Sequence, residues 1–296
     1  MARSRFRSDR GLTLRMGGVS FGLGLLYVAF AAVLITVMDG SVIALVIVLG
    51  IGWGQWYFSD TLALKSMRAK VVEPHQAPEL HAMIDRLCAL ADMPKPRVAV
   101  AETDIPNAFA TGRTPNHSAV CVTTGILQRL TAEELEGVLA HELAHVANRD
   151  VTVMTVASTL GILAGFITRW GMYFGGRNNN RNGAVGFLIV FVVSLVVYAI
   201  SFVLTRSLSR YRELSADRSG AYITGKPSQL ASALSKISGD MARIPSRDLR
   251  DTGAVSAFFF APALNRDSVS AMFSTHPPLE KRIAQLQQIS RELGEH

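Results

Sequence analysis

The fold is predicted from one stretch of sequence, Thr131-Ala-Glu-Glu-Leu-Glu-Gly-Val-Leu-Ala-His-Glu-Leu-Ala-His145. Thr131 and Glu134 form a capping box, so a helix is predicted to begin at Thr131 and to continue to Arg149. His141 and His145 are four residues apart on that helix, so they share one face and their ring nitrogens can reach a single Zn²⁺. The spacing therefore predicts a metal-binding helix.

A third ligand must come from elsewhere, because a catalytic zinc uses three protein ligands and keeps a fourth position open. The best candidate is Glu213 in the segment Arg212-Glu-Leu-Ser-Ala-Asp217. Asp217, one turn further on, is predicted to accept the other ring N–H of a zinc-bound histidine and so fix its tautomer. The alternatives are a solvated helix charge for Glu213 and a simple ion pair for Asp217.

The composition indicates a membrane protein. Of the 296 residues, 49% are hydrophobic and only 18% are charged. The net charge of +7 does not predict nucleic-acid binding, because the arginines concentrate beside apolar segments and form no basic face. Cys88 and Cys121, the only cysteines, have no CxxC spacing and indicate a reducing cytosolic compartment.

Four uncharged segments are long enough to cross a bilayer, residues 16–38, 40–59, 151–168 and 182–205. They are predicted to form two hairpins; a signal peptide for the first segment and a pair of buried core helices for the last two are the alternatives. Basic residues flank the first hairpin and place both of its outer ends in the cytosol: Arg3, Arg5, Arg7, Arg10, Arg15, Lys65, Arg68 and Lys70. Two spans separate His145 from Glu213, so both reach the same side of the membrane.

The predicted fold class is a mainly α membrane protein with four transmembrane helices and a cytosolic α+β zincin-like domain that contains a small sheet. Residues 1–60 hold the first hairpin and residues 151–205 the second, while residues 61–150 and 206–296 make the two parts of the protease domain. Within that domain we predict a helix over residues 78–92 and strands over residues 97–101 and 118–123.

Four blocks in order give the chain a resemblance to the HtpX-type membrane metalloproteases, in the gluzincin group that also holds the CAAX prenyl endopeptidases. The blocks are Asn107-Ala-Phe-Ala-Thr-Gly112, His141-Glu-Leu-Ala-His-Val-Ala-Asn-Arg-Asp150, Arg212-Glu-Leu-Ser-Ala-Asp217, and Thr275-His-Pro-Pro278 followed by Arg282. The resemblance covers nearly the whole chain. Residues 246–272, which include Phe258-Phe-Phe260, carry no readable motif and are a candidate lid, membrane-facing patch or substrate groove.

The resemblance implies that His141, His145 and Glu213 bind one zinc ion and that Glu142 is the general base. It also implies that the Asn107 segment is a sheet edge along which a substrate lies as an added strand. His276 is a candidate donor to the oxyanion, although the prolines after it equally suit a helix start.

The predicted function is zinc-dependent hydrolysis of peptide bonds in misfolded or damaged membrane proteins, on the cytosolic side of the cell membrane. In this mechanism zinc lowers the pKa of a bound water from about 15.7 toward 7, and Glu142 takes its proton. Two rival functions are a scaffold or chaperone-like binder with structural zinc and a CAAX-type endopeptidase. Membrane lipid and protein substrates are the expected partners, with no nucleic acid.

Overall fold

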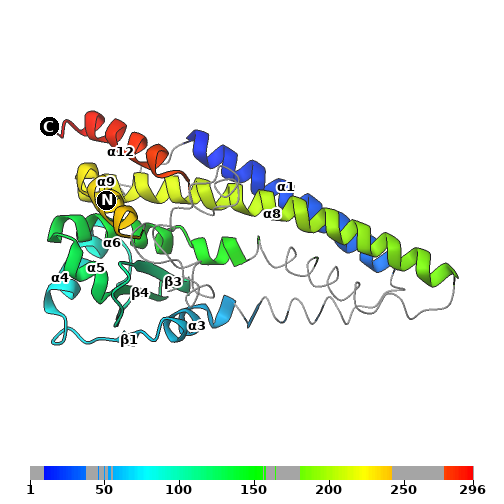
Figure 1. The fold of residues 1–296 in the computed structure, drawn as a ribbon, viewed down its shortest axis with the longest axis horizontal. Helices are drawn as coiled ribbons and strands as arrows, with labels where there is room; N and C mark the ends of the chain where they lie inside the picture. Colours follow the sequence, from blue (N-terminus) through cyan, green and yellow to red (C-terminus); the bar gives the residue numbers. More distant parts are fainter. Residues whose placement is uncertain are drawn as a thin grey trace. The chain divides into compact units, whose positions relative to one another are not determined.

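The computed structural model describes residues 10–37, 46, 50, 53, 54, 56–155, 157, 164, 181–241 and 277–295 (Figure 1). The chain divides into two compact units, and each takes residues from separate stretches of sequence. The first unit draws on residues 1–10, 57–151 and 210–296, and the second on residues 11–56 and 152–209. Residues 152–209 are therefore an insertion in the sequence of the first unit.

A four-stranded mixed sheet lies at the centre of the first unit, in the order β1-β2-β4-β3. Its strands are β1 (Lys70–Val71), β2 (Arg97–Ala101), β3 (Ala108–Thr114) and β4 (His117–Thr123). β2 and β4 are parallel, while the β1–β2 and β3–β4 pairs are antiparallel. The strands predicted at residues 97–101 and 118–123 are confirmed, and β3 is an edge strand of the sheet.

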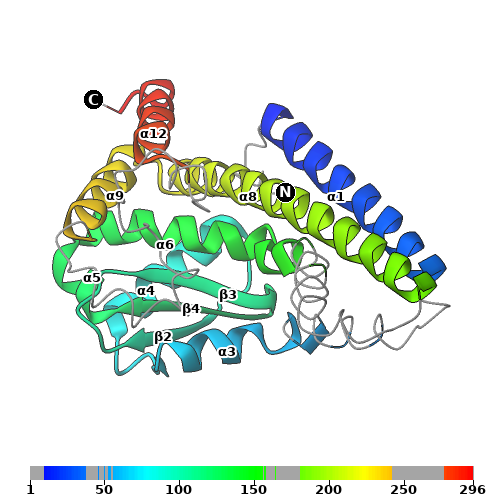
Figure 2. The same ribbon diagram turned by 45° about the vertical axis from the view of Figure 1, so that its right-hand side comes forward.

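Helices cover both faces of this sheet, as Figure 2 shows. The helix α3 (Ser59–Ser66) packs on one face, while α4 (Pro78–Ala91) and α6 (Ala132–Ala147) belong to the core on the other. Side chains alternate between the two faces along β4, because Val120 and Val122 join the α6 core whereas Cys121 joins the α3 cluster. The sheet is thus buried on both sides and gives α6 a rigid support.

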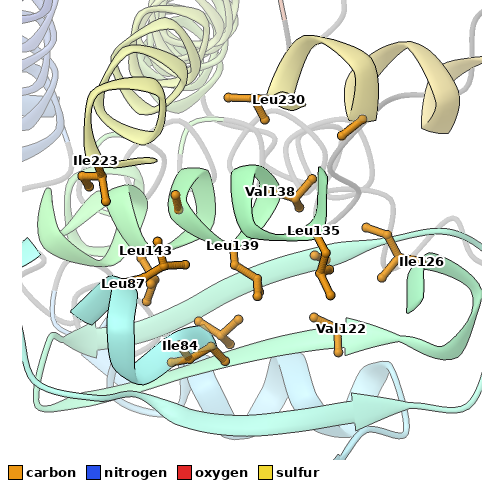
Figure 3. Packing of buried hydrophobic residues seen from close by; sticks show 14 of the residues in the cluster. Ile84, Leu87, Val122, Ile126, Leu135, Val138, Leu139, Leu143, Ile223 and Leu230 are labelled. Atoms are coloured by element: carbon orange, nitrogen blue, oxygen red, sulfur yellow. The ribbon is translucent and has the colours of Figure 1, made fainter. Parts of the chain in front are cut away.

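The core is built around α6, which is buried along most of its length (Figure 3). Leu135, Leu139 and Leu143 recur every four residues and point toward the sheet, while Val138 lies on the face toward Leu230. Burial of each such side chain contributes about 1.5–3 kcal/mol to folding. Leu230 belongs to α9 (Pro227–Met241), and α12 (Leu279–Leu293) also packs on α9. A short helix, α5 (Thr124–Arg129), follows β4. These contacts fix the position of α6 and of its polar face.

The second unit contains most of two long apolar helices, α1 (Arg10–Val37) and α8 (Arg181–Thr224), and the part of α8 from Arg210 onward belongs to the first unit. Within the described residues, parts of both helices are long and apolar enough to cross a membrane. They contain the first and fourth predicted spans, whereas the predicted spans at residues 40–59 and 151–168 lie largely outside the described residues. The helix α8 continues without a break past Glu213, as expected for a ligand that follows the last span.

Candidate metal centre

The helix that carries the two histidines begins as predicted. The Thr131 hydroxyl accepts a hydrogen bond from the Glu134 N–H at 3.3 Å, and the Thr131 N–H donates to the Glu134 carboxylate at 2.9 Å. Both halves of the capping box are therefore present, and α6 runs from Ala132 to Ala147. The cap fixes where the helix begins, and so fixes which face His141 and His145 share.

The side chains of His141, His145 and Glu213 meet with their ligand atoms within 4.8 Å of one another. The two Nε2 atoms are 3.1 Å apart, and Glu213 oxygens lie 3.7 Å from His141 Nε2 and 3.4 Å from His145 Nε2. Two nitrogens at Zn–N distances of about 2.0–2.1 Å in a tetrahedral site are separated by about 3.3 Å. The spacing of the donors fits a tetrahedral metal site.

The first histidine is supported from behind by a carboxylate and an arginine. His141 Nδ1 lies 2.9 Å from Asp217 Oδ1, and Arg282 donates to both Asp217 oxygens, at 2.7 and 2.6 Å. Burial acts to lower the pKa of Arg282, but the Asp217 and Glu213 carboxylates outweigh it and the pKa is raised. Arg282 therefore stays charged. Asp217 makes both the histidine contact and an ion pair, which the sequence had presented as alternatives.

The second histidine has a matching arrangement. His145 Nδ1 lies 2.5 Å from Asp150 Oδ2, and Arg212 forms an ion pair with the other oxygen of Asp150. A carboxylate beside Nδ1 accepts its hydrogen, which leaves the Nε2 lone pair free to bind a cation. When both rings are neutral and donate from Nδ1, their facing Nε2 atoms are both acceptors and cannot hydrogen-bond to each other. The donor set therefore suits a shared cation.

Burial is the main influence on the pKa values of His141 and Glu142, whereas the Glu213 and Glu142 carboxylates outweigh burial and raise the pKa of His145. Burial lowers the pKa of His141 to about 4, so this ring is neutral near pH 7, as a metal ligand must be. Burial also raises the pKa of Glu142 to about 7, although a backbone N–H donates to this carboxylate: that of Ala110, 2.8 Å from Oε2. A carboxyl with a pKa near the working pH can both take and return a proton.

The edge strand β3 brings its backbone to Glu142. Asn107 O accepts a hydrogen bond from the Thr123 N–H at 3.0 Å, so the backbone of Asn107 pairs with β4. Along an antiparallel strand, backbone groups point alternately toward the paired strand and away from it. The backbone groups of Ala108 and Ala110 therefore point to the open edge of the sheet. The Asn107 side chain is fully buried at the start of this strand. His276 and residues 246–272 lie outside the described residues.

Four residues around the site had no predicted role, namely Asp150, Arg212, Gly220 and Arg282. Asp150 ends one motif block and Arg212 begins another. The sequence therefore marks both residues, but it does not indicate that they contact each other. Gly220 lies where α8 crosses α6: a Cβ there would be 2.9 Å from His141 N. Such a close approach requires glycine, and no local pattern indicates which helical glycine has this role.

The chain matches the protein family described as Peptidase family M48 over residues 74–290. It is 57% identical to Protease HtpX homolog 1 of Streptomyces coelicolor, over 99% of this chain and 97% of that protein. It is also 52% identical to the Protease HtpX homolog of Moorella thermoacetica, over 99% of each. The crystal structure of S. mikatae Ste24p has the same fold, with a TM-score of 0.56 and 17% identity over 94% of this chain and 67% of that one. The predicted resemblance is confirmed, and the chain belongs to peptidase family M48 and, within it, to the HtpX-type membrane metalloproteases.

Proposed function

We propose that the chain is a multi-pass zinc endopeptidase in which His141, His145 and Glu213 hold the metal and Glu142 is the general base. One observation carries this proposal: two Nε2 lone pairs and a carboxylate converge at metal-ligand spacing, directly beside a buried carboxyl whose pKa is about 7. The first unit supplies all of these groups. A zinc ion bound there supplies Lewis-acid chemistry, lowering the pKa of water and stabilising an oxyanion.

Glu142 performs the proton transfers in this proposal. Its Oε1 and Oε2 can take a proton from the attacking water and return it to the nitrogen of the leaving amine. Ala110 holds the carboxylate through its N–H at 2.8 Å, so a peptide that pairs with the β3 edge is placed with its backbone beside Glu142. Asn107 is proposed to shape the start of this binding edge, and His276 to donate to the oxyanion, the latter on the resemblance alone.

We also propose the membrane arrangement. Large apolar side chains are exposed along α1 and α8, which suits contact with lipid: Phe21, Leu25 and Val28 on α1, and Leu188, Val192, Val196 and Val203 on α8. The cations that flank the first hairpin support a cytosolic location for the protease domain and both termini. The division into hairpins at residues 1–60 and 151–205 and protease segments at 61–150 and 206–296 is part of this proposal.

The test compares cleavage of casein by protein purified in detergent, with and without zinc, and measures the metal content of each sample. Glu142→Gln should keep the zinc and lose cleavage by about 10²-fold or more, because it removes the proton acceptor. Glu136→Gln is the matched control, since Glu136 lies on the same helix but pairs with Arg86. One zinc per chain with no cleavage by any variant would favour a structural-zinc scaffold.

A protease held in a membrane can reach membrane proteins, so we propose that its substrates are misfolded or damaged ones. Deletion of the gene should then raise the amounts of such proteins under heat or membrane stress. Expression of the Glu142→Gln variant in the deletion strain should not return these amounts to normal. A membrane proteome and stress tolerance that do not change on deletion would contradict this role.

A further inference from the structure

Asp150 and Arg212 lie close to the two ends of the insertion that separates the two parts of the first unit. The insertion begins at Thr152 and ends at Ser209, so Asp150 lies two positions before its first residue and Arg212 three positions after its last. Although 62 positions apart in sequence, the two side chains form an ion pair. The ion pair thus connects the segment that leads into the insertion with the segment that follows it.

This ion pair is buried and lies against a metal-ligand residue. Asp150 is 6% exposed and Arg212 is 4% exposed. The two oxygens of Asp150 have different partners, since Oδ2 contacts His145 Nδ1 at 2.5 Å and Oδ1 contacts Arg212. Burial of two charges is costly unless they are paired, so the pair is stable only while both side chains stay together.

The end of α6 brings Asp150 to this position. After the last helical residue, Arg149 has a φ of 55°, in the left-handed region in which a helix commonly terminates. The chain resumes a helix at Asp150 after this turn, and Asp150 lies beside the ring of His145, five residues back. Arg212 Nη2 also donates to the Asn148 carbonyl at 3.5 Å, and its positive charge lies at the helix C-terminus, where it is favourable.

We propose that Asp150 and Arg212 are positioning residues for His145, and that their ion pair holds this metal ligand in place from the two ends of the insertion. Asp150 accepts the Nδ1 hydrogen and directs Nε2 toward the metal, and Arg212 fixes the orientation of the Asp150 carboxylate. Arg212 therefore acts through Asp150. This inference rests on the proposed metal-binding function.

The test measures metal affinity by chelator competition and the visible absorption of the Co²⁺-substituted protein. Asp150→Asn should bind metal about 10–100-fold more weakly and shift the Co²⁺ spectrum, as expected when the partner of a ligating histidine is changed. Arg212→Met should weaken binding in the same direction, and Arg212→Lys should restore part of it. The double variant should be no weaker than Asp150→Asn, because Arg212 acts through Asp150.

Asp60→Asn is the control, because Asp60 pairs with Arg97 and joins α3 to the sheet. It should keep both the affinity and the Co²⁺ spectrum of the unmodified protein. Urea unfolding in chelator shows that each variant is folded before its metal affinity is compared. Unchanged affinity and spectrum in Asp150→Asn, or single effects that multiply in the double variant, would overturn the proposal. Failure of the unmodified protein to bind metal would instead contradict the proposed function.

Discussion

The close crossing of α8 over α6 leads to a sharp prediction for Gly220→Ala. The added Cβ would lie 2.9 Å from His141 N and 3.2 Å from its Cα, whereas ordinary contact begins at 3.4 Å. Both atoms are backbone, so the helices must separate by at least roughly 0.5 Å, and overpacking of this kind costs about 1–3 kcal/mol. A shift of about 1 Å at a catalytic site can reduce activity by about 10²-fold, so half of it predicts a loss of roughly tenfold.

Gly239→Ala is the matched control, because it also places alanine in a helix but has nothing within 4 Å of the new Cβ. Replacing a helical glycine by alanine stabilises by about 0.5–1 kcal/mol, and this contribution is shared by both variants. The difference between their free energies of unfolding in urea should therefore report the clash alone, about 2 kcal/mol. If Gly220→Ala were as stable as Gly239→Ala and as active as the unmodified protein, the close approach would not constrain the site.

Three further predictions follow from buried groups. Arg282→Met should lower the free energy of unfolding by about 3–5 kcal/mol, because it leaves the buried Asp217 charge unpaired; a loss below 1 kcal/mol in urea titration would contradict this. Thr131→Ala should cost about 1 kcal/mol through loss of the N-cap, and an unchanged unfolding midpoint would argue against the capping box. Burial raises the pKa of Cys88 to about 11 and of Cys121 to about 12, so iodoacetamide at pH 8 should label both only after unfolding, as mass spectrometry would show.

The features that the sequence could predict are those encoded within a few neighbouring residues. The capping box at Thr131 and the four-residue spacing of His141 and His145 are local, and the structure has the helix where they place it. Short apolar runs likewise indicated β2 and β4, and both strands are buried on the two faces of the sheet. Glu213 could be predicted as the third ligand because it follows the last span closely in sequence. The structure has one unbroken helix, α8, from that span past Glu213.

The rest depends on contacts between residues far apart in sequence. Arg282 meets Asp217 across 65 positions, and neither residue has a local pattern that identifies its partner. The pairing of β1 with β2 and the place of β3 at the edge are also set by how the strands assemble and not by their own composition. Gly220 looks like any glycine in a helix until its neighbour, the backbone of His141, is known.

The two arginines explain how four carboxylates could lie close to the divalent cation proposed for this site. Asp150 is neutralised by Arg212, and Asp217 by Arg282, so neither contributes net negative charge. Glu213 and, when ionised, Glu142 then remain to balance the two positive charges of a bound cation. When Glu142 carries the proton, one positive charge is left uncompensated at the site, and in a buried environment that charge favours an oxyanion. Without the arginines the same carboxylates would outweigh the cation, so the pairs that support the histidines also preserve the electrostatic stabilisation that catalysis needs.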